Sequence, residues 1–171
     1  MLFRSIGTDS DLRCWDGRHC RVFSSADGLC GGRIHILLED RRQQLWVGCS
    51  GGVHRWTGER FEYFDTSNGT EEKYAHTVTS ILEDSDGCLW FGTGSTFNNN
   101  CRWDGERLWS FPHQDGLIDA RVQAMLEDRD GYIWIGTWCG VCRGDRASIA
   151  VFTDTDGLPC NGVMSVLQDR Q

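Results

Sequence analysis

The sequence has only 2 prolines, and no stretch of it shows helical periodicity beyond a turn or two. An α-helical fold is therefore excluded. Apolar runs also stay well short of the ~20 residues that a membrane-spanning helix needs, so we expect no membrane insertion by this segment. Residues 1–8 include one arginine but no apolar core of a signal peptide, and we expect no export signal there.

Basic clusters are missing as well. The chain has 17 lysines and arginines against 25 aspartates and glutamates, which gives a net charge of −8. An acidic surface without a basic patch repels phosphate groups, so the sequence predicts no nucleic-acid partner and no anionic membrane surface.

Glycine and large aromatic residues are abundant, with 21 glycines, 8 tryptophans and 8 phenylalanines. This mixture is typical of short strands that are joined by tight turns and packed with aromatic side chains. The 9 cysteines fall at differing positions of the repeat described below, unlike the regular spacing of a disulfide framework. We expect most of them to be reduced, half-buried side chains.

An internal repeat dominates the sequence. Residues 38–48 (LEDRRQQLWVG) return at 82–92 (LEDSDGCLWFG) and at 126–136 (LEDRDGYIWIG). A second motif, Trp-Asp/Thr-Gly, occurs at 15–17, 56–58 and 103–105, and an aromatic residue follows each of its tryptophans by eight positions. A third motif, Asp-Gly-Leu, closes the unit at 27–29, 115–117 and 156–158. The basic period is about 41 residues, with small insertions that lengthen two steps to 44.

Each unit contains four short β-rich segments separated by glycine-containing turns. In the second copy these segments are 34–38, 45–48, 53–56 and 60–64. Four short antiparallel strands at this period are typical of a propeller blade, which must stack on neighbours to bury both of its faces. The sequence predicts an all-β chain of about four four-stranded blades.

The ends of the chain align at the same phase of the repeat. We therefore predict one propeller array over 1–171, with blades at 163–171 plus 1–27, 31–68, 75–115 and 119–156. Three arrangements stay open: a closed four-bladed ring, half of an eight-bladed homodimer, or part of a longer propeller with additional blades from flanking sequence. Copy one departs from the repeat, because Ser5 stands where the other copies have tryptophan.

The three linked motifs resemble the two-component regulator propeller repeat. Residues 81–93 (ILEDSDGCLWFGT) and 125–137 (MLEDRDGYIWIGT) carry the resemblance most clearly. Further departures are Gln43-Gln44 at the turn glycine and Gly144 at an aromatic position. The resemblance implies the sensor propeller of a hybrid two-component system, often one that senses saccharides outside the cytoplasm, which would place this chain in the periplasm.

Several motifs have simpler structural explanations. The Cys139–Cys142 pair in WCGVC aligns with a turn that enters a strand, whereas redox dithiols lie at a helix N-terminus. The repeated Asp-x-Asp-Gly segments lack the glutamate of a calcium loop and are typical of hairpin turns. We predict no catalytic residues, no metal site and no cofactor.

We expect the functional residues at repeat positions where the residue differs from copy to copy. Polar and aromatic residues vary from copy to copy at the start of the innermost strand and in nearby loops, where propellers bind ligands. The predicted ligand-binding residues are Arg33, His35, His76, Phe97, Arg121, Gln123, Trp138 and Asn161.

Three functions fit this pattern. The first is a non-catalytic sensor that binds a small molecule or saccharide, and the second is a scaffold that binds another protein. The third is a propeller enzyme similar to the streptogramin lyases, which use a histidine and a bound metal. The five histidines occupy different repeat positions, which favours the non-enzymatic hypotheses.

Overall fold

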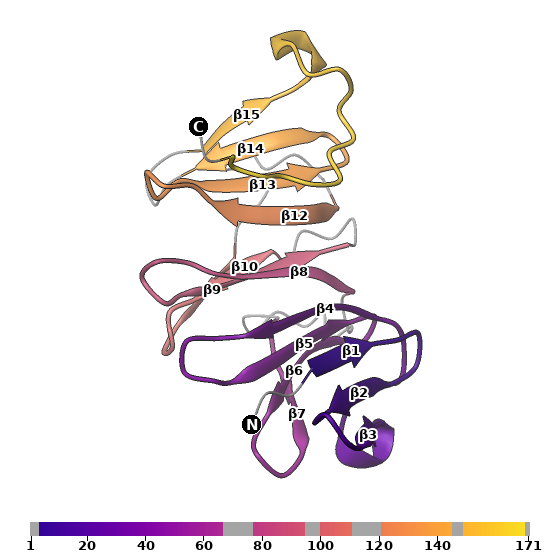
Figure 1. The fold of residues 1–171 in the computed structure, drawn as a ribbon. Helices are drawn as coiled ribbons and strands as arrows, with labels where there is room; N and C mark the ends of the chain where they lie inside the picture. The colour runs from indigo at the N-terminus through magenta and orange to yellow at the C-terminus, as the bar shows by residue number, and fades with distance from the viewer. Residues whose placement is uncertain (1–3, 67–76, 95–99, 111–120, 145–148, 170–171) are drawn as a thin grey trace. The chain divides into compact units, whose positions relative to one another are not determined.

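The structure is a computed structural model that describes residues 4–66, 77–94, 100–110, 121–144 and 149–169 (Figure 1). The chain divides into two compact units, Met1–Val78 and Thr79–Gln171. Each unit is described by itself below. Among the described residues, no helix is long and apolar enough to cross a membrane.

The first unit contains two antiparallel sheets. The first sheet has the order β1-β2-β3 and the second the order β4-β5-β6-β7, so strands adjacent in the chain are adjacent in space. The strands of the first sheet are β1 (Arg4–Gly7), β2 (Leu12–Trp15) and β3 (Cys20–Phe23). Those of the second sheet are β4 (Ile34–Glu39), β5 (Leu45–Cys49), β6 (Gly52–Trp56) and β7 (Phe61–Phe64).

Two further antiparallel sheets, called the third and the fourth, follow with the same up-and-down order. The third sheet consists of β8 (Val78–Glu83), β9 (Leu89–Thr93), β10 (Cys101–Trp103) and β11 (Leu108–Ser110). The fourth consists of β12 (Val122–Glu127), β13 (Ile133–Thr137), β14 (Gly140–Gly144) and β15 (Ile149–Phe152). The all-β propeller fold expected from the repeat is confirmed, with strand bounds within one or two residues of the predicted ones.

The turn between the first two strands of each four-stranded sheet explains the Asp-Gly motif. In the third sheet, Asp84 Oδ1 accepts backbone N–H bonds from Asp86 and Cys88, at 3.1 and 2.8 Å. Gly87 takes the left-handed conformation with φ +80°. Gln43 holds the equivalent position in the second sheet with φ +62°, a region that side chains with a Cβ disfavour.

The Asp-Gly-Leu motif forms a short 3₁₀ turn, η1 (Ser25–Asp27), after the first sheet. The Asp27 carboxylate accepts the backbone N–H of Ser24 at 2.9 Å. Gly28 then reverses the chain with φ +86°, and Leu29 enters the core with 3% of its surface exposed. The same turn returns as η3 (Asp154–Asp156) after the fourth sheet. The motif therefore ends a blade and anchors the chain before the next one.

Neighbouring sheets approach closely at a glycine of the second strand. A Cβ atom at Gly7 would lie 2.4 Å from Ile34 Cγ2, and one at Gly92 would lie 2.5 Å from Val122 Cγ1. Gly136 meets Val163 in the same way. Any side chain at these positions would push the following innermost strand away, so glycine sets the spacing between sheets.

Residues 163–168 lie against the fourth sheet as an innermost strand would. Val163 N donates to Thr137 O at 2.8 Å, just as Ile34 N donates to Thr8 O at 2.9 Å. Gln168 Oε1 accepts the Arg129 backbone N–H at 3.0 Å. However, residues 158–169 form no strand in the described structure, since no neighbouring strand pairs with them. The blade made from 163–171 and 1–27 therefore stays a prediction, and the first sheet has three described strands.

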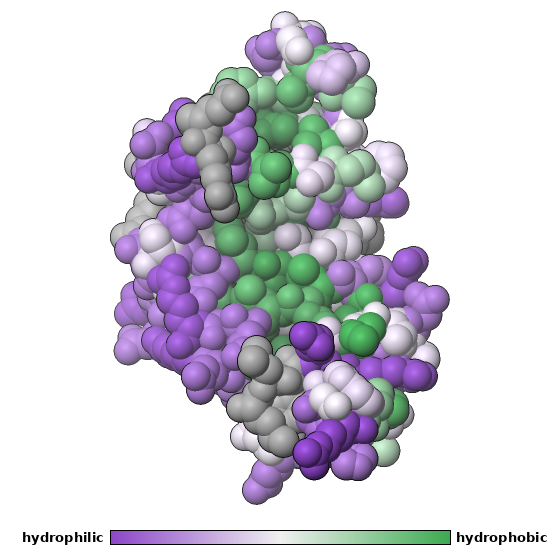
Figure 2. All heavy atoms as spheres, viewed as in Figure 1, coloured by the Kyte–Doolittle hydropathy of each residue, from purple (hydrophilic) through white to green (hydrophobic). Residues whose placement is uncertain are grey.

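Apolar side chains fill the space between the sheets. In the first unit, Leu12, Phe23 and Leu29 pack with Ile34, Val47 and Phe61. In the second unit, Val122 and Ile135 form part of a separate cluster. Burial of each such side chain stabilises the fold by about 1.5–3 kcal/mol. Hydrophobic residues also reach the surface within each unit, interspersed with hydrophilic ones (Figure 2).

Candidate ligand pocket and leading-end sites

A tryptophan bound to an aspartate recurs in the second, third and fourth sheets. The tryptophan lies on the second strand, and its indole N–H donates to the carboxylate of the preceding turn. The three pairs are Trp46 with Asp40 at 2.9 Å, Trp90 with Asp84 at 2.8 Å and Trp134 with Asp128 at 2.7 Å. An indole N–H leaves water at little cost when a carboxylate accepts it. The repeated Trp-Asp spacing therefore builds one core unit per sheet.

An arginine on the third strand completes each of these units. It lies directly opposite the tryptophan in the strand register, with its guanidinium 5.5–6.0 Å from the indole ring. These arginines are Arg55, Arg102 and Arg143. The Asp128 carboxyl has its pKa lowered, chiefly by the hydrogen bond from Trp134 and also by the charge of Arg143. The carboxylate thus stays ionised and holds both partners.

The first sheet keeps the strand pair of this unit but has neither its tryptophan nor its arginine. Ser5 lies where the tryptophan lies elsewhere, and Cys14 lies opposite it in the position of the arginine. The Ser5 hydroxyl and the Cys14 thiol are 3.3 Å apart. Two small side chains therefore replace an indole and a guanidinium at the same pair of backbone positions.

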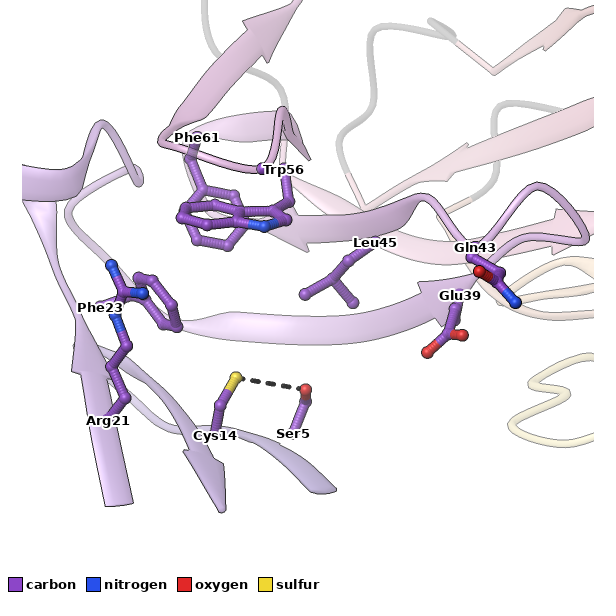
Figure 3. A pocket seen from close by; sticks show the side chains of 10 residues that line it. Ser5, Cys14, Arg21, Phe23, Glu39, Gln43, Leu45, Trp56 and Phe61 are labelled. Atoms are coloured by element: carbon purple, nitrogen blue, oxygen red, sulfur yellow. Dashed lines mark hydrogen bonds between the residues drawn. The ribbon is translucent and has the colours of Figure 1, made fainter. Parts of the chain in front are cut away.

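A cavity of about 480 Å³ opens beside Ser5 and Cys14 (Figure 3). Its apolar wall comes from the first and second sheets and includes Phe23, Leu45 and Trp56. All of its lining residues belong to the first unit. A volume in the range of roughly 300–1,000 Å³ with a mainly apolar lining and a few polar groups is typical of small-molecule sites.

The charged groups of the pocket stand at opposite ends in Figure 3. The Arg21 guanidinium lies 4.2 Å from the Phe23 ring centre and 5.6 Å from that of Trp56. Glu39 and Gln43 lie at the far end, beyond Leu45. The pocket can therefore hold a flat apolar body with an anionic group at one end and a hydrogen-bond donor at the other.

Sequence reasoning missed this pocket. The Ser5 departure was visible in the repeat alignment, but it was interpreted as a difference of the first copy and not as a void. A missing large core residue in one copy, together with a small residue at its cross-strand partner, was the signal that could have found it.

Two of the predicted site residues come together at one end of the second sheet. We define the leading end of a sheet as the end where its innermost strand begins. There Arg33 Nε pairs with Asp9 at 3.2 Å, and His35 Nε2 lies 3.1 Å from Ser50 Oγ. Partial burial lowers the pKa of His35, and the charge of Arg33 lowers it further. This cluster offers a neutral imidazole and a hydroxyl.

Three predicted residues meet at the leading end of the fourth sheet. Val122 lies opposite Thr137, so Arg121 and Trp138 flank that pair. Trp138 is 52% exposed and lies beside Gly162, the residue after Asn161. The Asn161 side chain accepts the backbone N–H of Asp154 at 2.7 Å.

The other predicted residues contribute differently. Gln123 turns its amide back to the carbonyl of Val122 at 3.3 Å. His76 and Phe97 lie outside the described residues.

Cysteine chemistry differs from the expectation at one place. Cys30 and Cys49 form a disulfide, and the sulfur of Cys49 lies 3.8 Å from His54 Nδ1. These three are the group of potential metal ligands found among the described residues. The two sulfurs are bonded to each other, so they are not thiolate ligands in this state. Seven other cysteines are free, and burial raises the pKa of the Cys142 thiol to about 11.

Known proteins resemble this chain in sequence and in fold. The profile of the family described as two component regulator propeller matches residues 75–95 and 116–139. A search of the curated proteins finds no match.

Among solved structures, the extracellular domain of the hybrid two component system BT4673 from B. thetaiotaomicron superposes with a TM-score of 0.79 at 18% identity. The match covers 97% of this chain and 23% of that one. The extracellular domain of BT3049, a hybrid two component system of the same organism, gives 0.76 at 20% identity and covers 99% and 25%. Virginiamycin B lyase from Staphylococcus aureus gives 0.59 at 13% identity, with 89% and 54% covered.

The chain thus spans about a quarter of the length of the two sensor domains. At these identities the superpositions establish the propeller fold. The family profile matches two of the repeats, so residues 75–95 and 116–139 are similar in sequence to the two component regulator propeller repeat.

Proposed function

We propose that this chain is a ligand-recognising part of the propeller of a two-component sensor, that it acts outside the cytoplasm, and that it binds a saccharide without transforming it. Two observations support the proposal: the propeller repeats of the regulator family, and the similarity to extracellular domains of hybrid two component systems.

The exposed ring of Trp138 is the observation that carries the choice of ligand. Trp138 is 52% exposed, so about half of its surface is open to a ligand. Its flat apolar face suits the C–H face of a sugar ring. Arg121 lies just before β12, whose first residue, Val122, pairs with Thr137 next to Trp138. Its guanidinium N–H groups can donate hydrogen bonds to sugar hydroxyl groups.

A binding role without chemistry is favoured by the distribution of the histidines. His54 is buried against Tyr63, and its pKa is lowered by that burial. His35 faces Ser50, and His19 lies 3.8 Å from Asp16 on an exposed turn. A lyase of the metal-dependent kind needs a histidine and a metal that converge on one site. These three histidines of the described chain stand on different strands and turns.

The test is saccharide binding by the Trp138→Ala variant. A glycan array identifies a ligand for the unmodified chain, and calorimetry then measures its affinity in the presence of a chelator. We expect Trp138→Ala to weaken binding at least tenfold. Trp109→Ala is the matched control, because Trp109 is 42% exposed on β11 of the same unit, and it should bind like the unmodified chain.

Three outcomes would overturn the proposal: no glycan bound, equal loss in both variants, or turnover of the bound ligand that stops on chelation. Turnover of the ligand would favour the lyase-like alternative. Binding of another protein without binding of any glycan would favour the scaffold.

A further inference from the structure

The pocket beside Ser5 has a chemistry of its own. In the second and fourth sheets, the equivalent volume holds an indole ring packed against the aromatic residue of the outer strand. Trp46 contacts Phe64 in this way, with ring centres 5.2 Å apart, and Trp134 stacks on Phe152 at 6.1 Å. Phe23 is the equivalent outer-strand residue of the first sheet and lines the pocket. The first sheet thus keeps the aromatic wall, Phe23, but lacks the indole ring that would pack against it.

The walls of the pocket suit an aromatic ligand. Phe23 and Trp56 meet edge to face with centres 4.9 Å apart, and Phe61 lies 5.5 Å from Phe23. These rings are fixed by the core, since Phe23 and Phe61 are 6% and 1% exposed. Rigid aromatic walls bind a planar ring at little cost in conformational entropy.

The charge of the pocket comes from an arginine that the other sheets lack. Arg21 lies on β3 directly opposite Cys14. The corresponding outer-strand residues are Glu62, Trp109 and Ala150. The guanidinium therefore stands one strand further out than the arginine of the other sheets, over Phe23 and at one end of the cavity. A cation in this place attracts a carboxylate and can bind it through two parallel hydrogen bonds.

We propose that this pocket binds a small aromatic carboxylate of about the size of an indole acid. The ring takes the volume that tryptophan fills in the other sheets, and the carboxylate pairs with Arg21. A ring N–H or hydroxyl at the other end faces Ser5 and Glu39. Because the site lies wholly within the first unit, the proposal is independent of saccharide binding at Trp138.

Calorimetry with two probes tests the proposal on the full 171-residue chain. Indole-3-acetate carries both the ring and the carboxylate, whereas 3-methylindole carries the ring alone. We expect saturable one-site binding of indole-3-acetate. Arg21→Gln should weaken that binding about tenfold and change the affinity for 3-methylindole by less than about twofold, because only the first probe has a charge to pair. Arg18→Gln, on the exposed turn of the same sheet, is the matched control and should leave both affinities unchanged.

Filling the pocket provides the second test. Ser5→Trp restores the residue of the other sheets and should abolish binding of both probes, while Trp138→Ala should leave it intact. If Ser5→Trp does not fold, the proposal is tested by Arg21→Gln alone, which should weaken the binding of indole-3-acetate and not that of 3-methylindole. Absence of saturable binding, equal effects of Arg21→Gln on both probes, or unchanged binding by folded Ser5→Trp would each overturn the proposal.

Discussion

The first and second sheets share one backbone plan and differ in what fills it. Ser5 faces Cys14 in the register in which Trp46 faces Arg55. The second sheet is packed by an indole that is 1% exposed and bound to a carboxylate. The first sheet has a cavity in the same place.

Comparison of the two sheets separates the interactions that position a strand from the interactions that add stability. Antiparallel backbone hydrogen bonding is present in both sheets, so it sets their geometry. The Trp-Asp-Arg unit is added in the second sheet and absent from the first, so it contributes stability that the geometry does not require. A repeat protein can therefore open a cavity in one copy and keep its stacking.

The largest expected effect comes from removing the indole where it is present. Trp46→Ala should lower the free energy of unfolding by about 3–5 kcal/mol, because it empties a fully buried site and leaves Asp40 Oδ2 without the indole N–H. Ser5→Ala, at the same repeat position, should cost less than about 1 kcal/mol. Urea denaturation of both variants measures the contrast. Similar costs would mean that the cavity beside Ser5 is closed in solution.

A smaller effect is expected from the carboxylate that binds the indole. Asp128→Asn keeps the oxygen that caps the turn but replaces the acceptor of the Trp134 N–H by a donor. The loss should be about 1.5–3 kcal/mol at neutral pH.

The same variant has a predicted pH dependence. The pKa of Asp128 is lowered in the folded state, so its ionised form contributes stability above the ordinary aspartate range. That contribution is lost as the pH falls through the lowered pKa, and the difference between the variant and the unmodified chain should shrink there. Asp16→Asn in the first sheet is the control for the loss at neutral pH: Asp16 Oδ1 accepts two backbone N–H bonds at 2.7 Å, which asparagine can also accept. Equal losses in the two variants would contradict a special role for the indole bond.

The smallest effect concerns a turn that departs from the repeat. Gln43 has φ +62°, whereas the equivalent Gly87 and Gly131 have φ +80° and +84°. Gln43→Gly should raise the free energy of unfolding by about 0.5–1 kcal/mol, because it removes the cost of a left-handed residue with a Cβ. Thermal unfolding measures the gain. Gly87→Gln should lower stability by a similar amount, and a loss in the first variant would show that the Gln43 side chain makes contacts worth more than the strain.

Much of the fold could be predicted from sequence because the same motifs mark the same strands and turns in several copies of the repeat. The Trp46, Trp90 and Trp134 spacing sets the register of the second strands, and the Asp-Gly turns set their beginnings. Trp138 and Arg121 were predicted at one end of a sheet because the register alone brings them together. Whether they bind a ligand is for experiment.

What could not be predicted depends on differences between copies. The cavity beside Ser5 needs the positions of side chains from two sheets, and Arg21 gains its meaning only when it is seen over Phe23. The Cys30–Cys49 disulfide joins a loop to a strand end, at positions that no other copy fills with two cysteines. Pairing of 163–167 with the start of the chain was one of three arrangements left open by the alignment, and it stays a prediction.

The glycine contact between sheets has an evolutionary consequence. Gly7, Gly92 and Gly136 each receive a β-branched side chain of the segment that follows, so these junctions within a unit use the same two-part fit. A duplicated copy can join the array wherever it brings that fit, whatever its interior contains. Selection can then erode the interior of one copy while its neighbours maintain the assembly. New binding sites in such a protein can arise by the loss of a core side chain, with no loop to invent.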